Sequence, residues 1–264
     1  MKRDLYRNVS LRIPSRTDFE ILQESRDWLV VAKPAPLVVH PSSGSTEVTL
    51  WDLLRESRPN EEVFLVNRLD RETSGCLLVA KSGKAARILG KSLARGDVAK
   101  EYLAIGHGWP EWDDCRVETG LRRKGEFTAS EIWVRQAIHP EGKPSITHFK
   151  VLQRWENKFG RFSQIRCWPE TGRTHQIRVH LESVGHGIVG DKIYGRDDSA
   201  YLRFLAEGWS DSLAHELLLP RQALHAARLR FPWNEEQVEV SCDLPGDLRS
   251  FEVAPERVVA FKKT

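Results

Sequence analysis

Short apolar runs separated by turn-forming residues are the feature that most restricts how this chain folds. WLVVAK (28–33) and CLLVAK (76–81) have the length and the Val and Leu content of buried strands, and Gly, Pro or Ser lie nearby in the chain. The same reasoning predicts further strands at 19–24, 62–70, 98–108, 131–136, 146–155, 161–170, 224–233 and 238–244, and a short one within 33–44. Many short strands with few helices predict an α+β fold around one large mixed, mostly antiparallel sheet.

Helical spacing of apolar residues is confined to a few segments. Residues 46–57 carry Leu50, Leu53 and Leu54, with Ser45 or Thr46 as the expected N-cap. Residues 84–97 form a second predicted helix that stops at Gly96. Its apolar face comprises Ala85, Ile88, Leu89, Ser92 and Leu93. A further helix is predicted over residues 174–185, and a helical insert over 196–220.

The chain carries no linker or internal repeat that would divide it. We expect a polar N-terminal extension over 1–18, which an edge strand could also explain, and one domain over 19–264 with inserts at 106–146 and 196–220. The N-terminus lacks the apolar core of a signal peptide, and no apolar run has the length of a membrane helix. The cysteines form neither a C-x-x-C pair nor a zinc-like cluster. A soluble, cytoplasmic protein is therefore expected. The sequence leaves the oligomeric state open, and we favour a monomer.

NRLDRETSG (67–75) is the first segment that could carry chemistry. If 62–70 is a strand, Arg68 and Asp70 share one of its faces. Arg68 and Arg71 flank the carboxylate of Asp70, and such cations favour its charged form, which can act as a base or a nucleophile. The alternative is an ordinary surface turn with an Arg–Asp pair.

TGRTHQIRVHL (171–181) is the second such segment. A helix that begins near Thr174 would present unpaired N–H groups beside Arg173, which predicts an anion site for phosphate or carboxylate. His175 and His180 have poor spacing for shared metal ligation, so we expect no metal here. The alternative is a polar helix end with a satisfied histidine.

A basic row follows one face of the predicted 84–97 helix, opposite its apolar face. It comprises Lys84, Arg87, Lys91 and Arg95, with Lys100 just beyond. Such a row suits an RNA backbone, although a solvated surface is the commoner explanation. The net charge of +3 allows a nucleic-acid partner without requiring one. GKS (90–92) lacks the preceding glycine of a phosphate loop, so no nucleotide cofactor is predicted.

Several segments together resemble the RluA-type RNA pseudouridine synthases. They are KPAPLVVHP (33–41), NRLDRETSGCLLVAK (67–81), KEYLAI (100–105), ETGRTHQIRVHLESVGHGIVGDKIYG (170–195) and ALHAARLRF (223–231), in the family's order. The resemblance covers residues 20–235 and implies an isomerase that converts specific uridines in transfer or ribosomal RNA to pseudouridine without metal or organic cofactor.

The resemblance also assigns roles to single residues. Asp70 matches the catalytic aspartate, Tyr102 the tyrosine that stacks on the base and helps to remove its carbon-5 proton, and Arg173 the arginine that pairs with the carboxylate. The expected RNA-contacting residues lie along both motifs and the basic row: Arg68, Arg71, Lys84, Arg87, Lys91, Arg95, Lys100, Thr174, His175, Gln176 and Arg178.

Two departures from the family pattern bear on substrate choice. Asn67 stands where the family usually has His, which predicts altered substrate contacts. Only a short segment precedes the matched region, so we expect no N-terminal RNA-binding module and assign substrate choice to the catalytic domain and its inserts. The sequence leaves open which uridine and which RNA are modified. A catalytically silent RNA-binding or RNA-chaperone protein on the same fold is the alternative, against which the joint presence of Asp70, Tyr102 and Arg173 speaks.

Overall fold

The computed structural model describes residues 19–41, 46–195 and 199–253 as two compact units. Unit 1 contains residues 19–41, 46–101 and 225–244, and unit 2 contains residues 102–195, 199–224 and 245–253. The predicted extension 1–18 lies outside the described residues. Among the described helices, none is both long enough and apolar enough to cross a membrane.

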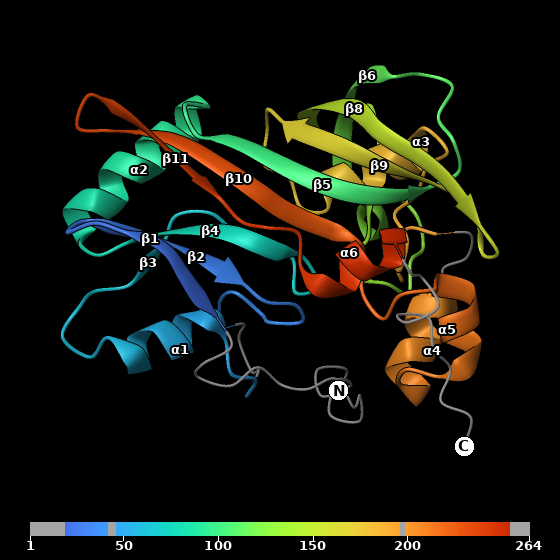
Figure 1. Cartoon of the computed structure of the whole chain (residues 1–264), viewed down its shortest axis with the longest axis horizontal. Helices are drawn as coiled ribbons and strands as arrows, with labels where there is room; N and C mark the ends of the chain where they lie inside the picture. The colour runs from blue at the N-terminus through green and yellow to red at the C-terminus, as the bar shows by residue number, and fades with distance from the viewer. Residues whose placement is uncertain (1–18, 42–45, 196–198, 254–264) are drawn as a thin grey trace. The chain divides into compact units, whose positions relative to one another are not determined.

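Unit 1 is built on a mixed sheet in the order β1-β2-β4-β10, with β3 beside β4 and β11 beside β10. The strands are β1 (Glu20–Glu24), β2 (Trp28–Lys33), β3 (Phe64–Leu65), β4 (Ser74–Ala80), β10 (Leu224–Trp233) and β11 (Glu236–Ser241). Among the described strands of unit 1, only the β4–β10 pairing is parallel, with His225 opposite Ser74 and Ala226 opposite Gly75. Figure 1 shows α1 (Leu50–Ser57) and α2 (Gly83–Arg95) beside these strands.

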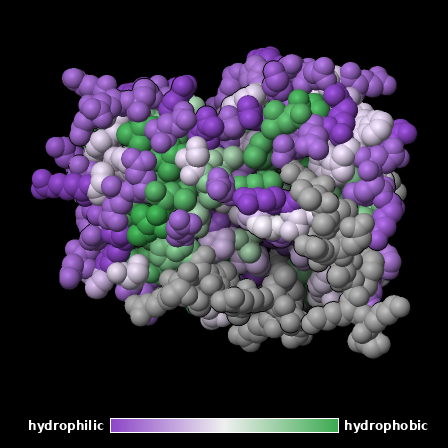
Figure 2. All heavy atoms as spheres, in the orientation of Figure 1, coloured by the Kyte–Doolittle hydropathy of each residue, from purple (hydrophilic) through white to green (hydrophobic). Residues whose placement is uncertain are grey.

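The core of unit 1 forms where α2 packs on the strands. Ala85 and Leu89 of α2 lie against Trp28, Leu78 and Phe231, all nearly inaccessible to solvent. In Figure 2 apolar residues gather in the left-hand part of the view, where Figure 1 draws the strands of unit 1, and hydrophilic residues surround them. The hydrophobic effect thus fixes α2 and leaves its basic face to water.

Unit 2 is built on an antiparallel sheet in the order β5-β9-β8-β6-β7. The strands are β5 (Ala99–His107), which enters the unit at Tyr102, β6 (Asp114–Arg123), β7 (Gln136–Ile138), β8 (Lys143–Asn157) and β9 (Gly160–Pro169). The helices are η2 (Lys124–Glu126), α3 (Gln176–Ser183), α4 (Ser199–Glu207), α5 (Asp211–Leu217) and α6 (Gly246–Val253). With the mixed sheet of unit 1, these elements confirm the predicted α+β class and its mostly antiparallel pairing.

Several element predictions were wrong in detail. The predicted strand at 131–136 does not form, because residues 132–135 make a turn and Gln136 begins β7. Strand β6, which was not predicted, occupies ten residues of the 106–146 insert. Within 62–70 only Phe64–Leu65 pairs as a strand, and no strand forms at 34–41. Helix α6 was also not predicted. The state of these segments depends on the partners against which they pack.

The helix ends also differ from prediction. Helix α1 begins at Leu50 because Thr49 and Asp52 form a reciprocal capping box, so the N-cap is Thr49. Ile88 is 43% exposed and does not belong to the apolar face of α2. Gly96 ends α2 in the left-handed conformation at φ 84°, as predicted.

Candidate active site

Asp70 lies in an irregular loop, residues 66–73, that connects β3 to β4 in unit 1. The carboxylate is half-buried, the neighbouring Leu69 is buried, and Arg68 is exposed. Because this loop is not a strand, the argument that Arg68 and Asp70 share a strand face was wrong. The backbone turns immediately after Asp70, whose carbonyl accepts the Thr73 N–H at 3.1 Å. The loop therefore presents a partly accessible carboxylate on a fixed turn.

Asn67 holds this loop to β4. Its side chain is buried, and its Oδ1 accepts the backbone N–H of Leu78 at 2.7 Å. The loop amide of Val66 also donates to the Leu78 carbonyl at 2.9 Å. Asn67 therefore has a structural role in this loop, and its predicted effect on substrate contacts stays a prediction.

Lys33, which sequence analysis did not single out, holds the Asp70 loop in place through a hydrogen bond to Arg71. Its ammonium is buried and donates to three carbonyls, those of Pro34, Leu37 and Arg71, at 2.8, 2.8 and 3.0 Å. The Leu37 amide donates to the same Arg71 carbonyl. The Lys-Pro segment is the one signal that could have indicated this role, because a buried Lys needs several acceptors.

Gly75 allows the strand after the loop to approach β10. A Cβ at this position would lie 2.2 Å from the Ala226 carbonyl oxygen, and φ is +111°. Beside it, the Ser74 hydroxyl and Nδ1 of His225 lie 2.9 Å apart, and His225 Nε2 contacts the Cys242 carbonyl at 3.0 Å. Because a carbonyl only accepts, Nε2 carries the proton and Nδ1 accepts from Ser74. The Ser-Gly end of the motif therefore packs β4 closely against β10.

Arg71, which sequence analysis places beside Asp70, forms an ion pair with Glu47. Its guanidinium Nη1 lies 2.8 and 2.9 Å from the two carboxylate oxygens of Glu47. The four cations of the predicted row on α2, namely Lys84, Arg87, Lys91 and Arg95, are exposed, and Arg95 pairs with Asp97. Lys100, at the start of β5, is half-buried, and burial lowers the pKa of its ammonium.

Tyr102 and Arg173 belong to unit 2 and lie toward the same end of its sheet. Tyr102 is buried on β5 opposite Cys167 of β9. Arg173 lies in the loop that follows β9, is exposed, and donates from Nε to the Pro144 carbonyl at 3.1 Å. Thr174 beside it is exposed, and His175 is half-buried. Asp70 belongs to unit 1, and its pairing with Arg173 stays a prediction.

Gln176 holds the Arg173 loop in place through hydrogen bonds. Helix α3 begins at Gln176, so the predicted start at Thr174 was two residues early. The buried Gln176 amide oxygen accepts from the Thr171 hydroxyl and the Arg173 N–H, at 2.7 and 3.0 Å. Its Nε2 donates to the Ile146 carbonyl and the Thr147 hydroxyl. With all four hydrogen-bonding positions used, Gln176 has none left for RNA.

Arg178 is likewise buried, in a two-pronged pair with Asp191. Its Nε and Nη2 donate to the two carboxylate oxygens at 2.6 and 2.8 Å. Burial by itself would raise the pKa of the Asp191 carboxyl, but Arg178 and the amides of Ile193 and Tyr194 hold that pKa below its usual range. Arg178 therefore stabilises unit 2 and, like Gln176, was wrongly read as a residue accessible to RNA.

Comparison with known proteins places these motifs in one family. The sequence model of the RNA pseudouridylate synthase family matches residues 27–183. Ribosomal large subunit pseudouridine synthase D of Haemophilus ducreyi is 35% identical over 241 residues, which cover 89% of this chain and 70% of that protein. The enzyme of the same name from Zymomonas mobilis is 34% identical over 250 residues, covering 89% and 72%.

Solved structures agree with the sequence comparisons. Human RNA Pseudouridylate Synthase Domain Containing 1 superposes with a TM-score of 0.68 at 29% identity, over 88% of this chain and 86% of that one. Human RNA Pseudouridylate Synthase Domain Containing 4 reaches the same TM-score at 24% identity, which supports the fold. From the family match, the identity to these relatives and the shared fold, we conclude that the chain belongs to the RNA pseudouridylate synthase family.

Proposed function

We propose that this isomerase, which converts uridine in RNA to pseudouridine, acts on large-subunit ribosomal RNA and uses Asp70 as its catalytic carboxylate. The observation that carries the role of Asp70 is its position: a half-buried carboxylate on a turn fixed by Asn67 and Lys33. The proposed RNA follows from relatives named for the large ribosomal subunit that align with 89% of this chain.

The reaction rearranges the substrate without adding or removing a group. The bond between carbon 1′ of ribose and N1 of uracil breaks, and a bond from carbon 1′ to carbon 5 forms. Carbon 5 loses a proton and N1 gains one, so the atoms balance without an oxidant or a donor group. A charged carboxylate beside carbon 1′ favours the breaking step, because positive charge develops on the sugar as the base departs.

Tyr102 and Arg173 complete the proposed catalytic set. The Tyr102 ring offers a flat apolar surface on a rigid strand, suited to stacking on the uracil, with a phenol to assist proton removal from carbon 5. In this proposed set Arg173 is the partner of the half-buried Asp70 carboxylate, because a neighbouring cation favours the charged form of an acid. A uridine inside a stem must flip out of its stack to reach these groups.

The proposed RNA contacts are those predicted residues that solvent reaches. They are Arg68, Arg71, Lys84, Arg87, Lys91, Arg95, Lys100, Thr174 and His175. Arg71, Lys100 and His175 are half-buried, and the others are exposed. The cations on α2 suit phosphate contacts, because their apolar neighbours anchor the helix while the charges face water. Such contacts position RNA without reading its sequence.

Release of tritium from RNA labelled at carbon 5 of uridine tests the reaction and the role of Asp70 together. Purified protein is incubated with large-subunit ribosomal RNA transcripts and, separately, with transfer RNA, in the presence of EDTA. Wild-type protein is expected to release tritium from the ribosomal RNA, and Asp70→Asn to release none, because the neutral amide neither attacks carbon 1′ nor balances its charge.

Asp114→Asn is the matched control, since it removes an exposed carboxylate at the start of β6 and is expected to keep wild-type activity. Release by Asp70→Asn would contradict the catalytic assignment, and release from transfer RNA alone would contradict the proposed substrate. RNA binding without any release by the wild type would favour the silent-binder alternative.

A further inference from the structure

The β6–β7 insert, residues 124–135, carries the most exposed large apolar side chain in the part of the chain that the structure describes. Trp133 is 72% exposed, whereas the next such residue, Val48, is 47% exposed. Val134 and Phe127 of the same insert are also exposed, at 41% and 39%. The insert thus gathers exposed apolar side chains in one short segment, a feature typical of a contact surface.

The indole of Trp133 is nevertheless held in place. The guanidinium of Arg123 stacks over the ring, with its carbon 3.7 Å from the ring centroid. Arg123 is itself tethered by an ion pair to Glu126 at 3.2 Å. Arg123 thus covers one face of a ring that is otherwise largely accessible, and the arrangement offers a preformed flat surface with a positive charge attached.

The backbone on both sides of Trp133 is anchored to the core of unit 2. Ile132 is 1% exposed and packs with Val179, Ile193 and Tyr194. The Arg135 amide donates to the Ile132 carbonyl, which forms a turn with Trp133 and Val134 at its tip. Because both ends of this turn are fixed, a planar ligand could bind to Trp133 at a low cost in conformational entropy.

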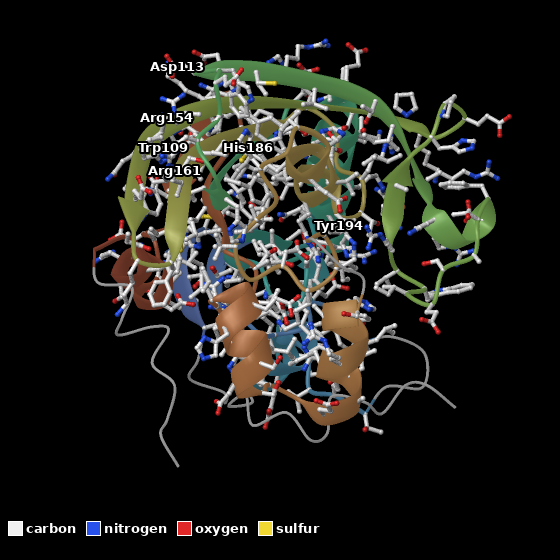
Figure 3. The ribbon with its side chains drawn as sticks, turned by 90° about the vertical axis from the view of Figure 1, so that its right-hand side faces the viewer. Trp109, Asp113, Arg154, Arg161, His186 and Tyr194 are labelled. Carbon is white, nitrogen blue, oxygen red and sulfur yellow. The ribbon has the colours of Figure 1, made fainter. Side chains whose placement is uncertain are left out.

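Arg135 and Tyr194 connect this turn to the Arg173 loop. Arg135 donates to the Ile193 carbonyl at 2.8 Å, and the buried Tyr194 hydroxyl accepts the Gln136 amide at the same distance. That hydroxyl also lies 2.9 Å from Nδ1 of His175, two residues after Arg173. Figure 3 shows the insert projecting in green at the right of the view, with Tyr194 close to its base.

The strand register places the insert and the Arg173 loop at one end of the unit 2 sheet. Leu121, just before the insert, lies opposite Lys143 at the start of β8, and Pro169 at the end of β9 lies opposite Thr147. Lys143 and Arg173 are exposed at this end, and so are the carboxylates Glu126, Glu131 and Glu141, of which Glu126 and Glu141 pair with Arg122. An occupant of Trp133 therefore meets a flat apolar ring, cations and a candidate catalytic loop together.

We propose that Trp133 and Arg123 form a stacking platform for an unpaired base of the substrate RNA, outside the nucleotide that is isomerised. RNA matches both parts of the site, because every base has a flat face for the indole and every nucleotide carries a phosphate for the cations. The inference rests on the proposed function and deepens it by assigning RNA recognition to the β6–β7 insert.

Equilibrium binding and turnover with the same large-subunit ribosomal RNA transcript test the platform. Trp133→Ala is expected to raise Kd about tenfold, the loss typical of one removed stacking contact, and Trp133→Phe to stay within about threefold because phenylalanine still stacks. At saturating RNA, kcat of Trp133→Ala is expected to stay within about twofold of wild type, because the residue acts on binding and not on the reacting atoms.

Trp109 supplies a matched control within the same unit. It is 40% exposed and carries Arg161 over its ring at 4.5 Å, but in Figure 3 both lie on the side of the view opposite the insert. Trp109→Ala is expected to leave Kd within about twofold of wild type, because that pair belongs to the opposite end of the sheet. Thermal unfolding of each variant checks that the fold is intact.

The outcomes separate this inference from the proposed function. Tritium release by wild type with equal Kd values for wild type and Trp133→Ala would overturn the platform and leave the function standing. If wild type binds the transcript more tightly than Trp133→Ala but releases no tritium, the proposed function would be overturned and the platform would stand. A dimer that Trp133→Ala dissociates, with RNA affinity unchanged, would show that a second copy of the chain is the occupant and would overturn the inference.

Discussion

The buried His180 of α3 makes the stability of unit 2 depend on pH in a direction that can be worked out from its contacts. The imidazole is 0% exposed, and its Nε2 lies 2.9 Å from the Ser145 hydroxyl. Ser145 gives its own proton to the Thr119 carbonyl, so it accepts from Nε2. Nδ1 lies 2.9 Å from the Thr147 hydroxyl, which accepts from Gln176 and donates to Nδ1. In the neutral histidine this network places the single proton on Nε2, which also lies 3.0 Å from the Thr119 hydroxyl.

A second proton would place a charge in this buried network. Burial lowers the pKa of His180 from an ordinary value of 6.5 to about 4. The unfolded chain binds the proton first as the pH falls, so the stabilisation is complete above pH 6.5 and is lost as the pH falls toward 4. Between pH 7.5 and pH 5 the predicted loss is about 2 kcal/mol of unfolding free energy.

Urea unfolding at pH 7.5, 6 and 5 measures this loss for wild type and for His180→Gln. The glutamine amide donates toward Ser145 but does not titrate, so the difference in unfolding free energy between the two proteins is expected to shrink by about 2 kcal/mol on acidification. His148→Gln replaces an exposed histidine of β8 and serves as the control. Parallel losses for wild type and His180→Gln over this pH range would refute the reasoning.

Two further substitutions each test a contact inside one unit, the first in unit 2 and the second in unit 1. Arg178→Met removes the partner of the fully buried Asp191 and is expected to lower the unfolding free energy in urea by about 3–5 kcal/mol; a loss below 1 kcal/mol would mean that the pair is dispensable. Gly75→Ala forces a Cβ to within 2.2 Å of the Ala226 carbonyl oxygen, so we expect about 3 kcal/mol of destabilisation and impaired tritium release. Gly96→Ala, where φ is also positive but no atom lies within 4 Å, should cost only about 1 kcal/mol, and equal losses at the two glycines would contradict the steric argument.

Elements with strong local signals could be predicted from the sequence. Strands β2 and β10 follow the predicted ranges 28–33 and 224–233 to the residue, because continuous apolar or alternating patterns mark buried strands wherever they pack. The end of α2 at Gly96 likewise needs only a glycine that tolerates a positive φ. The family could be recognised for a related reason: its motifs are contiguous, and their order survives in the linear chain.

The 131–136 segment shows where local pattern fails. EIWVRQ has the β-branched and aromatic content of a strand, yet residues 132–135 form a turn because Ile132 fills the core beside Tyr194 and Arg135 donates to the Ile193 carbonyl. Those partners lie about sixty residues further along the chain. No window of the sequence contains both, so the exposed Trp133 at the tip of the turn could not be anticipated.

What the sequence by itself determined is the chemistry available: an aspartate between two arginines, a tyrosine on a strand, a Gly-Arg-Thr-His loop and a basic helix face. Tertiary structure alone decided which of these side chains solvent reaches. Gln176 and Arg178 are polar, as are their exposed neighbours Arg173 and Thr174. Because α3 is buried along most of its length, the Gln176 and Arg178 side chains bond to Thr147 and Asp191 inside the protein. The physical reason is that a buried polar group must find its partners inside the protein, and those partners come from strands and loops that only folding brings together.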